Sequence, residues 1–550
     1  MLNSPGTLRW PWLLLAGVLA ASPLLWLDAV GWRLAANSLM LVLGVVVLAV
    51  PLGTFLAVLL FRFAVPLRRL WITLLVLQIF VPLYVFGAAW RSTLGFTGWA
   101  HDTPLGRLSW LMLEGWSGAI WVHVAAAVPW VVLIVGLALR YVEPELEEDA
   151  LTSGSAWQVL RHVTLRRAGL AALVAALWIA VITATEITAT DLFQVRTFAE
   201  ELYSSLAATA TTPVNETQAV IANTAIAAWL AVVLMVVVSK LAVFAKQPSM
   251  RRAVLLPLTA GKRAVATCSA ALAIIVFVGI PIGTLVRNAG ISFVPGADGR
   301  PQQTWNAADA ARMIVTSPMT YHEEYGWSLE IAVAAATCVV VVAAGVCWFG
   351  RSGGLRAAPA LGISAICLAI PGPLLAIGII KLLNQQESDL FPLLGQSDAV
   401  VVARSMVHKA LVFLYDRTIV PPLTAQVIKA LPVAILILWL IFRGVPEETL
   451  ESASTAGAGR WTRFWRIAMP QRLAALSAAW FAAFALAIGE VPASILLNPP
   501  GIETISPMIF RLLHGENVYE IAGIILAMFC LIALVTGFIA LWWRKYWQRD

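Results

Sequence analysis

Charged residues are scarce in this sequence of 550 residues. Asp, Glu, Lys and Arg together make up 12% of the chain, whereas hydrophobic residues make up 60%. Soluble domains contain about 25% charged and about 45–50% apolar residues. The polar surface of this chain is too small to cover a soluble globule. The composition therefore excludes an ordinary soluble domain and predicts an integral membrane protein.

Cysteine and histidine are also few, and their spacing excludes the common metal and redox motifs. The five cysteines are scattered through apolar runs, so we interpret them as packing residues. The six histidines show no paired spacing, and no G-x-x-x-x-G-K-[ST] phosphate-binding loop occurs. No constellation of catalytic residues converges. We therefore expect no bound metal, no cofactor and no enzymatic activity in this chain.

Long apolar runs are abundant, and each is near the length of about 20 residues that spans the hydrocarbon core. The first is interpreted as an uncleaved helix rather than a signal peptide, because no clear small-x-small cleavage site follows it. Tryptophans gather near the ends of many runs, as in an interfacial aromatic belt. The twelve predicted helices lie near 11–31, 37–61, 70–90, 118–139, 168–190, 218–243, 264–286, 327–349, 358–382, 420–442, 473–495 and 519–543.

The loops between these runs alternate in charge. Basic residues are in excess in 62–69, 244–263 and 350–356 and in the C-terminal tail, whereas acidic residues dominate 191–217 and 288–326. Cytoplasmic loops of membrane proteins carry the excess of Lys and Arg. We therefore expect a multi-pass protein with both termini in the cytoplasm. The net charge of +7 reflects these loops rather than a nucleic-acid partner.

Two hydrophilic segments interrupt the helices at matching places, after the fourth and tenth runs. Each has a glutamate with alanine two residues later and glycine six residues later, followed by a tryptophan and a basic cluster. Such a segment predicts a short helix, a turn at the glycine and a second helix, a bracket suited to docking in a partner's groove. An ordinary surface helix is the alternative. The matching residues are Glu148, Ala150 and Gly154 in the first segment and Glu451, Ala453 and Gly457 in the second.

The match continues into the next helix of each half. Glu186 lies 29 residues after Trp157, and Glu490 lies 29 residues after Trp461. Repeated halves of this size indicate duplication and pseudo-symmetry. The predicted fold class is therefore an all-α integral membrane protein, with about twelve transmembrane helices in two pseudo-symmetric halves of six.

The two glutamates are carboxylates at membrane depth, where an isolated charge costs about 2.5–3.5 kcal/mol or more. One interpretation places Glu186, Asp191 and Glu490 along a translocation pathway, because carboxylate oxygens suit a hard cation such as ferric iron. The other is structural: Glu186 and Glu490 cap broken helices or fix the packing between halves. The residue pattern slightly favours the structural interpretation. His123, within an apolar run, is interpreted as a packed residue.

The pattern E-x-A-x-x-x-G, followed by two apolar residues and proline, resembles the cytoplasmic coupling loop of type I ATP-binding-cassette importer permeases. The second segment matches it well, with Ile467, Met469 and Pro470 in the tail. The first is one residue shorter, and Arg166 stands where proline is usual. In that family the loop inserts into a groove of a cytoplasmic ATPase. The resemblance thus implies ATPase-coupling roles for the glutamate, alanine and glycine of both segments.

Within this family, the chain is most similar to the double-length permeases of ferric-iron importers. The similar stretches are VRTFAEELYSSL, PGPLLAIGII and GEVPASILLNPPGIETISPMIFRLLHG. The resemblance implies a bacterial inner-membrane permease that works with a separate ATPase dimer and an extracytoplasmic binding protein. Double-length thiamine permeases are close relatives, so thiamine or another small solute is the alternative substrate. An ion-coupled secondary transporter remains the alternative of another class.

These observations divide the chain into five parts. The two permease domains are expected to be similar transmembrane units, and the segment between them holds the cytoplasmic link, the seventh helix and an external loop. The predicted parts are an N-terminal helix at 1–32, a first permease domain at 33–243, the intervening segment at 244–326, a second permease domain at 327–543 and a tail at 544–550.

Overall fold

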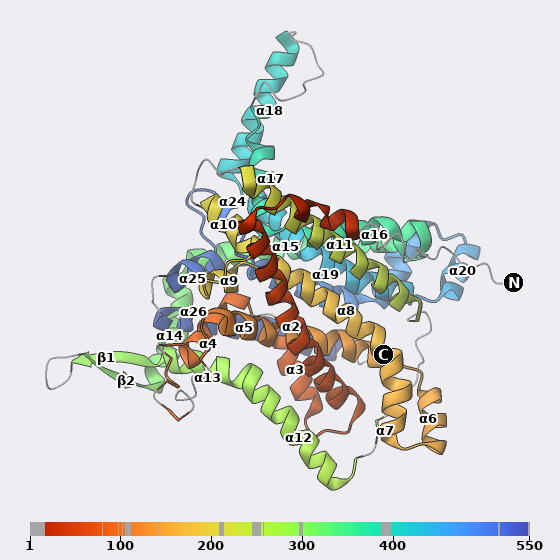
Figure 1. Ribbon diagram of the computed structural model, residues 1–550. Helices are drawn as coiled ribbons and strands as arrows, with labels where there is room; N and C mark the ends of the chain where they lie inside the picture. The colour runs from red at the N-terminus through yellow and green to blue at the C-terminus, as the bar shows by residue number, and fades with distance from the viewer. Residues whose placement is uncertain are drawn as a thin grey trace.

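The structure is a computed structural model, and nearly all of the chain that it describes is helical (Figure 1). One two-stranded antiparallel hairpin, β1 (Ile291–Pro295) and β2 (Pro301–Trp305), accompanies the described helices, with Ile291 opposite Trp305. The described residues are 17–79, 81–96, 98–101, 103–104, 112–140, 142–207, 214–244, 255–256, 258–295, 301–386, 398–514 and 518–547.

Seven helices in the described ranges are long and apolar enough to cross a membrane. Two of them contain one π-helical turn within an otherwise α-helical span. In such a turn the backbone hydrogen bonds join residues five positions apart. The seven are α2 (Ala29–Arg62), α5 (Gly115–Arg140), the unit of α7 (Ala156–Val159), η3 (Leu160–Thr164) and α8 (Leu165–Ala184), α11 (Val214–Phe244), the unit of α12 (Ala260–Ile274), η4 (Ile275–Gly279) and α13 (Ile280–Ala289), α15 (His322–Gly350) and α19 (Val420–Arg443).

Three further pairs of helices are sharply bent instead of forming straight spans. Pro82 and Pro371 stand at the bends of the first two pairs, because the residue before a proline is disfavoured in helical conformation. The pairs are α3 (Arg68–Gln78) with α4 (Leu83–Leu94), bent by 104°, η5 (Gly354–Ala357) and α16 (Ala358–Ala369) with α17 (Gly372–Leu383), bent by 101°, and α21 (Arg460–Arg463), η7 (Phe464–Ala468) and α22 (Met469–Gln471) with α23 (Leu473–Ile488), bent by 80°.

The described structure therefore contains seven to ten candidate spans, and the predicted number of twelve is not confirmed. The predicted runs 70–90 and 358–382 are broken at their prolines, and the run 473–495 ends as a helix at Ile488. The run 11–31 lies partly outside the described residues. Its described part is a short apolar helix, Gly17–Trp26, which includes η1 (Ser22–Trp26), followed by the start of α2 at Ala29. The run 519–543 falls within α26 (Val518–Trp547).

Short helices connect these elements. α18 projects away from the rest of the chain, and α6 and α20 lie at the opposite end of the molecule from the β1–β2 hairpin (Figure 1). The short helices are α6 (Pro144–Ser153), α9 (Thr188–Leu192), α10 (Phe198–Ala207), α14 (Ala307–Thr320), α18 (Asp398–Arg417), α20 (Glu447–Thr455), α24 (Ser494–Leu497) and α25 (Ile505–His514).

The core consists of two similar three-helix arrangements. α2 packs along α5 and both contact α8, while α15 packs along α19 and both contact α23. Small residues permit this close packing, as is usual between helices in membranes. A Cβ atom on Gly53 of α2 would lie 2.5 Å from the Cβ of Val131 on α5, so only glycine fits this contact.

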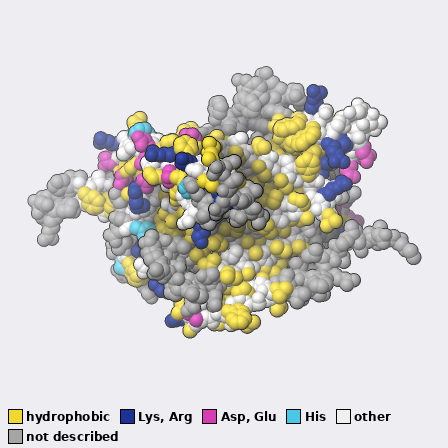
Figure 2. All heavy atoms as spheres, turned by 90° about the horizontal axis from the view of Figure 1, so that it is seen from above, with side chains coloured by type: hydrophobic (Ala, Val, Ile, Leu, Met, Phe, Trp, Pro, Cys, Tyr) yellow, Lys and Arg dark blue, Asp and Glu magenta, His cyan; other side chains and the backbone are white. Residues whose placement is uncertain are grey.

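The outer surface is apolar in the middle. Figure 2 shows hydrophobic side chains across the centre of one face, with most of the charged side chains toward its two ends. On α2, Leu39, Leu43 and Val47 are exposed although they are large and hydrophobic. An exposed apolar band between charged ends is typical of a protein surrounded by lipid, and it agrees with the composition.

Candidate functional site

The first hydrophilic segment forms the predicted bracket of two helices. α6 begins with Pro144 at its first turn and carries Glu145 and Glu147 there, which suits the positive end of a helix dipole. The helix ends at Gly154. Ser155 then caps α7 through a reciprocal capping box with Gln158.

The second segment forms the same bracket. α20 begins after Pro446 with Glu447 and Glu448 in its first turn, and it ends at Thr455. A turn through Gly457 leads to α21 at Arg460. The corresponding glutamates, Glu148 and Glu451, are both exposed, and the corresponding alanines, Ala150 and Ala453, are both half-buried. The structure thus brings each predicted triplet together on one short helix and its turn.

The two glycines differ in conformation. Gly457 has φ +86°, in the left-handed region that favours glycine, and a Cβ there would meet nothing within 4 Å. Gly154 has φ −139° and ψ 162°, an extended conformation open to any residue. A Cβ on Gly154 would lie 3.2 Å from the carbonyl oxygen of Ala150, which is only a tight contact. Glycine is therefore required by the backbone in the second loop alone.

Two features of these brackets were not predicted from the sequence. A π-helical turn begins three residues after Trp157, as η3, and another begins three residues after Trp461, as η7. Such turns are rare and occur frequently at functional sites. The two tryptophan side chains are also exposed, Trp157 to 65% and Trp461 to 60%. The equal spacing of these residues was a signal, but local sequence does not distinguish a π-turn from an α-turn.

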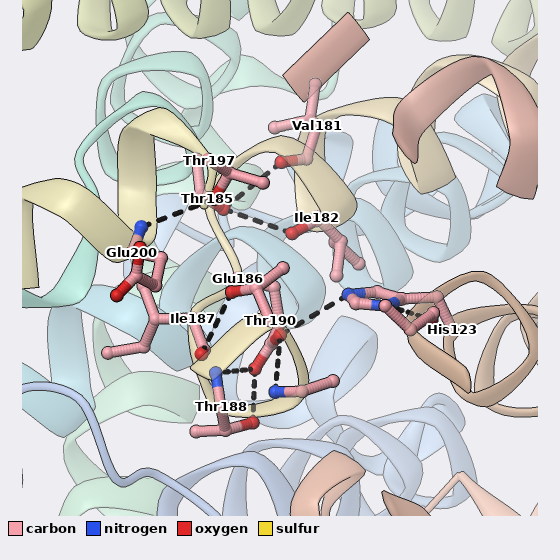
Figure 3. A network of polar contacts seen from close by, with 12 residues as sticks. His123, Val181, Ile182, Thr185, Glu186, Ile187, Thr188, Thr190, Thr197 and Glu200 are labelled. Atoms are coloured by element: carbon pink, nitrogen blue, oxygen red, sulfur yellow. Dashed lines mark hydrogen bonds and ion pairs between the residues drawn. The ribbon is translucent and has the colours of Figure 1, made fainter. Parts of the chain in front are cut away.

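Glu186 lies at the break between α8 and α9, at the centre of a polar network (Figure 3). Its Oε1 accepts a hydrogen bond from the backbone N–H of Thr188 (2.6 Å) and from the Thr188 hydroxyl, and its Oε2 accepts one from the N–H of Ala189 (3.1 Å). His123 on α5 places Nε2 3.3 Å from Glu186 Oε2. The other ring nitrogen, Nδ1, donates to the carbonyl of Ala119 at 2.7 Å.

Glu490 has the same arrangement at the break between α23 and α24. Its Oε1 accepts the N–H of Ala493 at 2.8 Å, and its Oε2 accepts the N–H and hydroxyl of Ser494 at 2.9 and 2.8 Å. Both glutamates thus satisfy backbone donors at the start of a short helix, which is the capping geometry. Lys429 is half-buried near Glu490 and donates from Nζ to the carbonyl of Ile370 at 2.9 Å. Sequence analysis had not singled out Lys429.

Asp191 lies on α9 and lines a cavity of about 500 Å³ beside α25. His514 places Nε2 3.0 Å from Asp191 Oδ2, and its Nδ1 lies 2.9 Å from the carbonyl oxygen of Phe510. Because both ring nitrogens face acceptors, the doubly protonated imidazolium is favoured, and the hydrogen bond to Asp191 raises the pKa of His514. Glu503 and Arg511 also line this cavity and form an ion pair of 2.9 Å.

The carboxylates do not assemble into a metal centre. Within the described ranges, no group of three or more His, Cys, Asp or Glu side chains lies close enough to hold an ion. Asp191 lines the cavity with His514, whereas Glu186 and Glu490 each bind the backbone of their own helix break. The glutamates therefore have full sets of partners, and Asp191 is the predicted pathway residue that faces an open space.

Comparison with known proteins identifies the second half of this arrangement. Residues 328–550 match the model of a family described as the binding-protein-dependent transport system inner membrane component. The matched region contains α20, its turn at Gly457, η7 and the Glu490 cap. No curated protein matches the chain. The match indicates a permease domain of a binding-protein-dependent ATP-binding-cassette transport system over residues 328–550, in a chain with several candidate membrane spans.

Proposed function

We propose that the whole chain is the fused, two-half permease of an ATP-driven importer. The observation that carries the proposal is the pair of helix–turn–helix brackets, of which the second lies inside the family match. Each half would contribute one coupling loop to a separate cytoplasmic ATPase dimer. An extracytoplasmic binding protein would deliver the substrate to the other side of the bacterial inner membrane, with both chain termini in the cytoplasm.

Structural correspondences between residues 33–243, which lie outside the family match, and the matched region support a first permease domain at 33–243. α5 and α19 each contain a buried proline, Pro129 and Pro432. η3 and η7 follow the two exposed tryptophans at equal distances, and Glu186 and Glu490 cap helices at equal distances after them. The first half has the same order of these features as residues 327–543, which supports duplication of one ancestral half.

The surfaces of the two brackets are suited to docking. Glu148 and Glu451 are exposed, and the large side chains of Trp157 and Trp461 are exposed in the same brackets. Tryptophan is enriched among the residues that carry most of the energy of protein interfaces. Both brackets lie on the side of the molecule opposite the β1–β2 hairpin (Figure 1). Closure of an ATPase dimer would draw the two loops together and move the attached helices α8 and α23.

Asp191 is the strongest candidate among the three proposed pathway residues. It lines the cavity together with side chains of the second half, so a substrate at this place would contact both halves. Backbone N–H groups donate to the carboxylates of Glu186 and Glu490. These hydrogen bonds favour a structural role, in which the two glutamates stabilise the helix breaks after α8 and α23. A transport role for these two glutamates would require them to exchange a backbone partner for substrate.

Ferric iron is the proposed substrate, because three stretches of the sequence resemble those of double-length ferric-iron permeases. Thiamine is the alternative. Uptake of radiolabelled iron and of radiolabelled thiamine by a deletion strain, with and without the restored gene, would decide between them. Iron uptake that depends on the gene supports ferric iron, and gene-dependent uptake of thiamine alone supports thiamine. If the deletion reduces the uptake of neither compound, both substrates are rejected.

The importer proposal is tested by purifying the tagged full-length chain in lipid nanodiscs and identifying bound ATPase subunits by mass spectrometry. We expect an ATP-binding-cassette ATPase whose retention is lost when Trp157 and Trp461 are both changed to alanine. The matched control replaces the exposed Trp305 of the β1–β2 hairpin, which is on the other side. A purified chain that transports substrate with an ion gradient and no ATPase would identify a secondary transporter instead.

A further inference from the structure

A buried ion pair lies beneath the first bracket. Arg62, the last residue of α2, places Nη1 2.9 Å from Oε2 of Glu147 on α6, and the two side chains are 0% and 1% exposed. The other oxygen of Glu147, Oε1, accepts a hydrogen bond of 2.5 Å from the hydroxyl of Thr164. Thr164 is the last residue of η3, and it is also buried. One carboxylate therefore ties together α2, the bracket helix α6 and the start of α8.

The end of α2 is an anchor for more than this carboxylate. The carbonyl oxygen of Arg62 accepts a hydrogen bond of 2.8 Å from the N–H of Leu256, and Phe63 and Leu256 form a parallel bridge. The chain that leads into α12 is thereby fixed at the same point as α6. A displacement of Glu147 relative to Arg62 would disturb four segments at once.

The second bracket has apolar residues at the same positions. Leu450 precedes Glu451 as Glu147 precedes Glu148, and it is buried. Ala468 follows Trp461 by seven residues, as Thr164 follows Trp157, and it is buried too. η7 packs through Phe464 on Trp348, with ring centroids 5.4 Å apart, and on Phe442 at 6.1 Å. Arg351, which follows α15, stacks its guanidinium on Trp348, with Cζ 3.8 Å from the ring centroid. The ion pair described within this half, Glu503 with Arg511, lies at α25 and not at the bracket.

These two joints differ in their physics. The hydrophobic effect is non-directional, so an apolar joint fixes relative position through the shapes of the packed side chains alone. A buried ion pair is directional, and removing one partner leaves an uncompensated buried charge, a change that is strongly destabilising. α6 is therefore held to the transmembrane helices by directional polar contacts as well as by packing, whereas α20 is held through buried Leu450 by apolar packing.

We propose that Arg62 and Glu147 are positioning residues that lock the first coupling helix to α2 and α8, so that this loop transmits motion of the ATPase as a rigid unit. The second loop transmits it through an apolar joint. The two halves of the permease then respond unequally to the same closure of the ATPase dimer. This inference depends on the proposed importer function, because it assigns a role within the coupling step.

The test measures how far a signal from the ATPase reaches the other side of the molecule. Spin labels are placed at the exposed positions Arg196 and Pro500, in a full-length chain whose native cysteines are changed to alanine. The complex with its captured ATPase is reconstituted in nanodiscs, and the distance between labels is measured by pulsed electron paramagnetic resonance with and without a non-hydrolysable ATP analogue. Binding of the ATPase to each variant is measured in parallel.

Three variants decide the question. Glu147→Gln removes the charge but keeps the shape, and the double variant Arg62→Met with Glu147→Leu gives the first loop an apolar joint like the second. Replacing a buried ion pair by apolar residues is often neutral or stabilising, so the double variant remains a test even where Glu147→Gln folds poorly. Glu143→Gln is the control, since Glu143 lies just before α6 and pairs with Arg167 across an exposed contact of 3.9 Å, which contributes little to stability.

We expect both buried variants to bind the ATPase within about twofold of the parent and to lose more than half of the distance change induced by the ATP analogue. Glu143→Gln should retain all of it. A double variant with the full distance change would show that the pair only stabilises the fold, and it would overturn the proposal. Loss of ATPase binding in proportion to the distance change would also overturn it. If the parent chain binds no ATPase, the importer proposal itself fails.

Discussion

Substitution of the two loop glycines is expected to have unequal effects. Gly457 adopts φ +86°, and a Cβ there would meet nothing within 4 Å, so the cost of Gly457→Ala comes from the backbone alone. A left-handed conformation costs an L-residue roughly 1–2 kcal/mol. If the loop relaxes in the free permease and must return to this conformation to dock, ATPase binding carries that cost. Because about 1.4 kcal/mol is a factor of ten in affinity, the dissociation constant should rise by roughly 5- to 30-fold.

The first loop supplies the matched comparison. Gly154 is extended, with φ −139°, so Gly154→Ala avoids the backbone penalty and meets only the 3.2 Å contact with the Ala150 carbonyl. We expect its dissociation constant to rise by less than about fivefold, the factor that corresponds to roughly 1 kcal/mol. Asparagine visits left-handed conformations more readily than alanine, so Gly457→Asn should bind more tightly than Gly457→Ala. β-Branched valine should bind least.

The assay is the affinity of the purified ATPase for the permease in nanodiscs, measured by biolayer interferometry. Thermal unfolding of each variant shows whether the transmembrane fold is intact. Equal effects of Gly154→Ala and Gly457→Ala, or tighter binding by Gly457→Val than by Gly457→Asn, would refute the reasoning from backbone conformation.

Three further predictions concern other sites. Glu490→Gln should lower the free energy of unfolding by about 1–3 kcal/mol and reduce uptake. The reason is that the NH₂ group of glutamine would face backbone N–H groups, which now donate to the carboxylate. Unchanged melting and uptake would exclude both a structural role and a transport role for Glu490. The contact of Asp191 with His514 should be fully formed below pH 6.5 and weaken as pH rises through the raised pKa of His514, an effect seen as a longer Arg196–Pro500 label distance and abolished by His514→Gln. Trp157→Ala and Trp461→Ala should each weaken ATPase binding at least fivefold, or about 1 kcal/mol, with little change in melting temperature, since both side chains are exposed; a large fall in melting temperature would assign them to the fold instead.

Composition and periodicity were sufficient to predict a membrane protein rich in apolar helices. The bilayer imposes a length and a polarity on each span, and these requirements act on local sequence. Prolines and acidic residues also marked where α6 and α20 begin, because helix N-termini favour them. The equal spacing of Trp157 to Glu186 and of Trp461 to Glu490 marked the two glutamates as corresponding positions, but the predicted runs 168–190 and 473–495 continue past both, whereas α8 ends at Ala184 and α23 at Ile488.

Tertiary structure alone decided how these pieces meet. Pro82 accounts for a break in the run 70–90, but the angle of 104° between its two helices depends on how they pack against their neighbours. The two glycines occupy matching positions in the sequence, but only Gly457 adopts the left-handed conformation. Pairing of Arg62 with Glu147 spans 85 residues, and pairing of Asp191 with His514 spans 323. Such partners are chosen by the packing of distant helices, which periodicity within one helix does not encode.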